Sequence, residues 1–130
     1  MNKFLKFFLP PILWAGIIFW NSSLPRPPIP QIEFNHFDKI LHFGAYFILG
    51  YLTTRAWLVG KREKRTMKIY FISALIGILY GLSDEFHQYF VPGRSSEWSD
   101  WLADSLGIIG AQFMIHFQYK IFPERWANMI

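Results

Sequence analysis

The sequence predicts an all-α protein, a four-helix transmembrane bundle with both chain termini in the cytoplasm. First, 52% of the 130 residues are hydrophobic and only 17% are charged, whereas about a quarter are charged in an ordinary soluble domain. Second, the apolar residues fall into four runs, each close to the roughly 20 residues that cross a bilayer as a helix. Third, the basic residues gather on one side of these runs. A single domain, residues 1–130, holds all four helices.

The first predicted helix, residues 5–24, has no charged residue after Lys6. Lysines before an apolar run are also typical of a cleaved signal peptide. That alternative is disfavoured because the run is long for a signal peptide and residues 21–25 lack the small-x-small cleavage pattern. We therefore expect a helix that stays in the membrane.

The other three helices are predicted at residues 38–60, 68–91 and 100–119, where ionisable residues interrupt the apolar runs only rarely. The connections between the helices contain turn signals. A proline-rich stretch precedes the second helix and cannot itself be helical. A short basic loop precedes the third helix, and Pro92-Gly93 marks a turn before the fourth.

The distribution of charge predicts the orientation of the bundle. With four spans, the two termini and the middle connection share one side, and ten of the 13 lysines and arginines lie there. Basic residues are retained on the cytoplasmic side of a membrane, so that side is the cytoplasm. Seven of the nine acidic residues lie on or near the other side.

Small residues predict which helices touch, because they let helix backbones approach closely in a membrane. Gly77 and Gly81 form such a pair in the third helix, and Gly107 and Ala111 form one in the fourth. We therefore expect these two helices to pack against each other along these faces.

The candidate functional residues lie at the extracytoplasmic ends of the last three helices. An ionised side chain deep in a membrane costs about 2.5–3.5 kcal/mol even on a gentle insertion scale, so these groups need one another or a water-filled cavity. Spacings of three and four residues place them in one-turn stripes on the helix surface. We predict a polar pocket whose ligand-binding residues are Asp38, Lys39, His42, Asp84, Glu85, His87, Gln88, Arg94, Asp100 and Asp104.

Several of these residues have a purely structural alternative. Asp38 and Asp100 could be helix N-caps, since aspartate is favoured there. Arg94 could anchor the chain at the membrane interface. His87 could point to the headgroup layer.

The sequence does not settle whether the protein is an enzyme, because no known catalytic motif occurs in it. Asp84, Glu85 and His42 are the candidates for acid–base catalysis. Carboxylates and histidine could hold a hard ion or zinc, but no spacing specifies such a site, and we predict no metal and no cofactor. Nucleic-acid binding is excluded because the basic residues lie in short clusters between apolar runs.

Three ordered motifs lie in this polar region: Asp38-Lys39-x-x-His42, then Asp84-Glu85-x-His87-Gln88 running into Pro92-Gly93-Arg94, and then Asp100-x-x-x-Asp104-x-x-Gly107. On these motifs the chain resembles the VanZ-like family of small bacterial membrane proteins, over about residues 21–110. One departure is Asp104, which stands where the family often has asparagine.

The resemblance implies a multi-pass protein of the bacterial cell membrane. The family's founder is associated with resistance to the glycopeptide antibiotic teicoplanin, and no reaction is implied. The family's motif residues, transferred by position, are Asp38, Lys39, His42, Asp84, Glu85, Gln88, Arg94 and Asp100.

The leading functional hypothesis is a cell-envelope protein that binds an amphiphile or a lipid-linked cell-wall precursor in its polar pocket. One alternative is an enzyme that acts on a lipid headgroup. Another is a structural or accessory subunit that partners a membrane protein or its own copies. A proton-coupled transporter is disfavoured because the cytoplasmic halves of the helices lack polar residues to continue a path.

Overall fold

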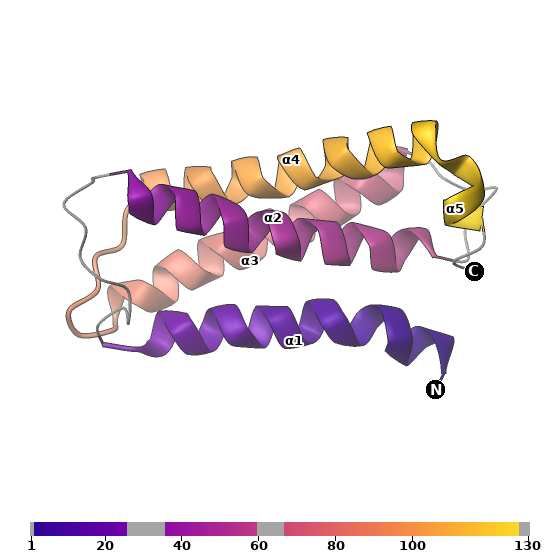
Figure 1. Cartoon of the computed structure of the whole chain (residues 1–130). Coiled ribbons are helices and arrows are strands. Elements are labelled where there is room, and N and C mark those ends of the chain that lie inside the picture. The colour runs from indigo at the N-terminus through magenta and orange to yellow at the C-terminus, as the bar shows by residue number, and fades with distance from the viewer. Residues whose placement is uncertain (1, 26–35, 60–66, 128–130) are drawn as a thin grey trace.

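The computed structural model describes residues 2–25, 36–59 and 67–127, and no strand occurs among them. They form α1 (Lys3–Ser23), α2 (Phe37–Leu58), α3 (Met67–Tyr89), α4 (Trp98–Ile121) and the short α5 (Pro123–Ala127). The four long helices run alongside one another, and α1 begins at the same end of the bundle at which α4 ends and α5 lies (Figure 1). The all-α prediction is confirmed, and the four long helices agree with the predicted ranges within a few residues. The short α5 was not predicted.

The outer surface of the described helices is apolar. Ile12, Phe71 and Phe113, from three different helices, are 64%, 68% and 63% exposed. By length and composition, α1 and α3 are able to cross a membrane. The polar residues that make α2 and α4 less apolar are partly turned inward, where Thr54 and Asp104 are fully buried. This pattern fits a protein whose outside is covered by lipid.

The backbones of α2 and α4 approach each other closely at two glycines. A Cβ atom on Gly107 of α4 would lie 2.9 Å from the backbone nitrogen of Phe47, and one on Gly50 of α2 would lie 3.0 Å from the Cα atom of Ile108. The two helices can pack this closely only because neither glycine has a side chain. Their contact is the most extensive between any two described helices.

The predicted contact between the third and fourth helices is confirmed for the glycine pair of the third helix. A Cβ atom on Gly81 of α3 would lie 3.3 Å from Asp104 on α4, and Gly77 faces Ile108 on the same helix. The prediction for Gly107 was wrong, because this glycine faces the backbone of α2. Ile108, the next residue, lies close to both Gly50 of α2 and Gly77 of α3.

Helix α1 is joined to the other helices through hydrogen bonds to backbone carbonyls. The indole nitrogen of Trp14 donates to the carbonyl of Ala45 on α2 at 2.8 Å. The hydroxyl of Tyr80 on α3 donates to the carbonyl of Ala15 at 2.6 Å. Both bonds lie midway along α1, so they fix its position along the bundle.

Candidate functional site

The polar side chains meet at one end of the bundle, opposite the described chain ends, where α2 and α4 begin and α3 ends (Figure 1). Asp84, Glu85, Asp100 and Asp104 are all at least 95% buried there. Burial of this many carboxyl groups is uncommon unless they are paired. The predicted convergence of the three helix ends is therefore present in the structure.

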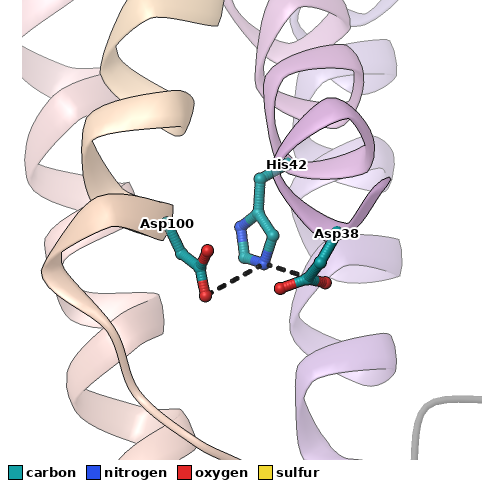
Figure 2. Close-up of side chains that lie close together, drawn as sticks. All are labelled: Asp38, His42 and Asp100. Atoms are coloured by element: carbon teal, nitrogen blue, oxygen red, sulfur yellow. Dashed lines mark ion pairs between the residues drawn. The ribbon is translucent and has the colours of Figure 1, made fainter. Parts of the chain in front are cut away.

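His42 of α2 lies at the centre of this cluster. Its Nδ1 atom is 2.9 Å from Asp104 Oδ1 and 3.9 Å from Glu85 Oε1. On the other side of the ring, Nε2 lies 3.8 Å from Asp38 Oδ1 and 3.9 Å from Asp100 Oδ2, as Figure 2 shows. The imidazole thus stands between carboxylates from α2, α3 and α4.

The possible N-cap roles of Asp38 and Asp100 are not what the structure shows. The capping positions are occupied by His36 for α2 and by Glu97 for α4, and neither makes a side-chain capping hydrogen bond. Asp38 and Asp100 lie inside the first turns and turn toward His42 (Figure 2). Their negative charges still favour the positive end of each helix dipole.

Lys39 joins the starts of α2 and α4. Its Nζ atom lies 2.9 Å from Asp100 Oδ1 and 3.2 Å from Glu97 Oε2. The ammonium group lowers the pKa of Glu97, mainly through this hydrogen bond. Since Asp100 is buried and Glu97 is half exposed, solvent screens the pair with Glu97 more than the pair with Asp100.

Glu85 ties the end of α3 to the connection before α4. Its Oε2 atom accepts hydrogen bonds from the backbone nitrogen of Glu97 at 3.3 Å and from the hydroxyl of Ser96 at 3.4 Å. Ser96 also donates to the Glu85 carbonyl at 2.8 Å. The sequence analysis did not identify Ser96 and Glu97 as site residues. Only their short separation from Asp100 in the sequence could have suggested them.

Asp84 makes different contacts from its neighbour Glu85. Its Oδ2 atom accepts hydrogen bonds from the hydroxyl of Tyr46 at 3.0 Å and from the amide of Gln88 at 3.4 Å. Gln88 also donates to the hydroxyl of Ser22 on α1 at 3.2 Å. Asp84 therefore belongs to a network that reaches α1, and Tyr46 and Ser22 are members that the site prediction did not include.

His87 and Arg94 are engaged with the end of α1. His87 Nε2 lies 3.0 Å from the Ser23 hydroxyl, and the imidazole stacks on Phe19 with ring centroids 4.8 Å apart. Arg94 donates from Nε to the Leu24 carbonyl at 3.1 Å and from Nη2 to a second carbonyl of the same helix end. A cation stabilises the negative end of a helix dipole, so Arg94 secures α1. Neither residue contacts the His42 cluster.

A cavity of about 240 Å³ lies beside the cluster, between α1 and the helices α2 and α3. One part of its lining is apolar and includes Trp14, Ile17, Ile18, Leu41 and Ala45. The other part is polar and consists of Asn21, Ser22, Asp38, His42, Tyr46, Asp84, Gln88 and Arg94. Five of the ten predicted ligand-binding residues therefore line one cavity.

The chain is similar to one protein family over most of its length. The family profile described as VanZ/LLP1 matches residues 7–119. The chain belongs to the VanZ/LLP1 family. The matched range includes every predicted site residue, so the resemblance inferred from the three motifs is confirmed. VanZ/LLP1 membership and the two apolar helices together indicate a membrane protein. The chain matches no curated protein and no solved structure.

Two groups of side chains in this VanZ/LLP1 protein have a geometry compatible with a metal ion. The first group is Asp38, His42 and Asp100, and the second is His42, Glu85 and Asp104. In each group the ligand atoms lie within 4.8 Å of one another. Sequence spacing could not specify them, because each group draws its members from two or three helices. The two groups share the His42 ring and use opposite nitrogens of it.

Proposed function

We propose that this VanZ/LLP1 protein binds an amphiphile, or a lipid-linked cell-wall precursor, with the polar head in the cavity beside α1. The observation that supports this best is the divided lining of the cavity, with an apolar wall next to buried polar groups. Ligand sites are typically concave, mostly apolar and furnished with a few convergent polar groups. An amphiphile matches both parts of such a lining.

Asp84 is the residue that we expect to contact the head directly. It lines the cavity, and its Oδ1 atom is buried without a hydrogen-bond partner among the described residues. A hydroxyl or ammonium group of the ligand would satisfy this oxygen, which otherwise costs about 1–3 kcal/mol in lost solvation. Arg94 at the same cavity and Lys39 beside it would attract anionic parts of the head.

The proposal includes four membrane spans with both termini in the cytoplasm, which puts the cavity in the outer half of the bacterial cell membrane. The positions of the chain ends in Figure 1 and the bias of basic residues support it. Alkaline phosphatase is active only outside the cytoplasm. Fusion after Ser95 should therefore give activity and fusion after Ile130 should give none; the reverse pattern would refute the topology.

Native mass spectrometry of the purified protein with cell-envelope lipids and their precursors tests ligand binding. We expect a specific lipid whose binding falls at least tenfold in Asp84→Asn, by about the 1.4 kcal/mol that a lost hydrogen bond to a charged group provides. Glu97→Gln is the matched control, because Glu97 lies at the same end of the bundle outside the cavity. Equal and unselective lipid binding in all three proteins would refute the proposal.

A second candidate function, an enzyme acting on a lipid headgroup, is favoured by one observation. Asp84 and Glu85 each have a buried carboxylate oxygen without a hydrogen-bond partner among the described residues, and His42 lies beside Glu85. Such groups can act as general acids and bases. Release of a headgroup product by wild type, and its loss in Glu85→Gln, would favour this function over binding alone.

Teicoplanin resistance and protein partners also belong to the proposal. A link to teicoplanin predicts that a strain lacking the protein becomes more susceptible to this antibiotic and recovers with wild type but not with Asp84→Asn. An accessory role, with a membrane-protein partner or a second copy, predicts a stable complex when the protein is extracted in mild detergent. Unchanged susceptibility would refute the link to teicoplanin, and a monomer in mild detergent would refute the accessory role.

A further inference from the structure

We propose that His42, Glu85 and Asp104 bind one divalent transition-metal ion of the zinc type between α2, α3 and α4. Sequence spacing could not indicate such a site, because each ligand comes from a different helix. The proposal concerns the cluster next to the cavity and does not depend on amphiphile binding.

The distances in the cluster are close to those of a metal site. Ligand atoms about 2.0–2.1 Å from a tetrahedral zinc ion lie about 3.3 Å from one another. His42 Nδ1 lies 2.9 Å from Asp104 Oδ1 and 3.9 Å from Glu85 Oε1. All three ligand atoms lie within 4.8 Å of one another. Small side-chain rotations would therefore suffice to admit the ion.

A buried, unpaired oxygen of the cluster faces the proposed site. Glu85 Oε1 has no hydrogen-bond partner among the described residues, its side chain is only 6% exposed, and it lies 3.9 Å from His42 Nδ1. Asp104 Oδ2 also has no such partner, but it lies on the side of Gly81, and Asp104 Oδ1 is the oxygen at the site. Buried carboxylate oxygens are normally paired with donors or ions, because an unpaired one loses its solvation without compensation. Glu85 Oε1 is the oxygen of that side chain nearest to His42.

The charge of the cluster also favours a bound cation. Glu85 and Asp104 are buried and bring two formal negative charges to the cluster, and the ammonium group of Lys39 is already paired with Asp100. A divalent ion with a neutral imidazole would balance these two charges. Metal ligation of this kind is one of the few ways to keep carboxylates buried.

The remaining nitrogen of His42 faces two carboxylates. Histidines that ligate metals usually donate their other ring N–H to a carboxylate, which fixes the ring orientation and raises its basicity. If Nδ1 binds the ion, Nε2 faces Asp38 and Asp100 at 3.8 and 3.9 Å (Figure 2). The second group of metal-compatible residues therefore supports the first and is a weaker ion site, since Asp38 is exposed and Asp100 pairs with Lys39.

The donor set selects the class of ion. One imidazole nitrogen and two carboxylates suit zinc and similar ions, whereas magnesium and calcium prefer all-oxygen sites. Three protein ligands leave a fourth tetrahedral position open, as in zinc sites that bind an exogenous group.

The test begins with the full chain, purified in detergent, stripped with EDTA and desalted. We expect calorimetry and elemental analysis to find one zinc ion per chain, binding at least tenfold more tightly than magnesium. Zinc should also raise the midpoint of thermal unfolding, because it binds only the folded chain. Absence of stoichiometric zinc binding would overturn the proposal.

Variants then locate the ion. Glu85→Gln and Asp104→Asn keep the side-chain shape and should weaken zinc binding at least tenfold. Glu97→Gln and His87→Gln, which alter an acid and a histidine outside the cluster at the same end, should bind zinc like wild type. Equal zinc affinity in all four variants and wild type would place the ion elsewhere and refute the assignment.

A measurement on wild type covers the case in which a variant does not fold. In protein with ¹⁵N-labelled histidine, paramagnetic Co²⁺ at one equivalent should shift or broaden the ring signals of His42 while leaving those of His116 sharp. His116 lies near the other end of α4 and is the internal control. Unaffected His42 signals at saturating Co²⁺ would overturn the proposal.

Discussion

Gly107→Ala tests whether the close contact between α2 and α4 holds the bundle together. The added Cβ atom would lie 2.9 Å from the Phe47 nitrogen and 3.2 Å from the Phe43 carbonyl carbon, so the backbone of α2 has to move. Overpacking of this kind costs about 1–3 kcal/mol. Alanine in place of glycine inside a helix also stabilises the helix by up to about 1 kcal/mol, because alanine has the higher helix propensity. We therefore expect a net loss of up to about 2 kcal/mol in the free energy of unfolding.

Gly44→Ala is the matched control for this substitution. Gly44 lies on α2 with open space around its Cβ position, so alanine there should stabilise the protein by about 0.5–1 kcal/mol. Unfolding by a denaturing detergent in mixed micelles measures both variants against wild type. If Gly107→Ala proves as stable as Gly44→Ala, the close α2–α4 contact does not exist in the protein.

Two further substitutions test the polar cluster by the same unfolding assay. Tyr46→Phe removes the donor to buried Asp84 and should cost about 1–3 kcal/mol; wild-type stability would contradict this hydrogen bond. Lys39→Met leaves Asp100 buried without its cation, and we expect a loss several times that of Glu97→Gln, which removes only the exposed partner and should cost less than about 1 kcal/mol. Equal losses in these two variants would show that burial of the Asp100 pair has no energetic effect.

The sequence was sufficient to predict features that depend on one helix at a time. Apolar run length located the four long helices, and the four-residue spacing placed Asp38 with His42 on one face. Asp100 and Asp104 likewise share one face of α4. These predictions rest on the helical repeat alone.

Features that depend on how helices are arranged around the bundle could not be predicted. Gly107 was assigned to the wrong neighbour because a small residue indicates a close contact without naming the partner. Spacing placed His87 on one face of α3 with Asp84 and Gln88, but its contact with Ser23 depends on where α1 packs. Arg94 follows a turn, and its target at the end of α1 depends on where that helix docks.

The attachment of α1 has a consequence for the choice of solubilising medium. Trp14 and Tyr80 donate to carbonyls of neighbouring helices, and in hydrocarbon no solvent molecule competes for these acceptors. Near the headgroup layer, a detergent micelle is more hydrated than a bilayer, and water there could replace the contacts that Arg94 makes with the same helix. We therefore expect α1, and the cavity wall that it forms, to keep these contacts better in lipid nanodiscs than in detergent micelles.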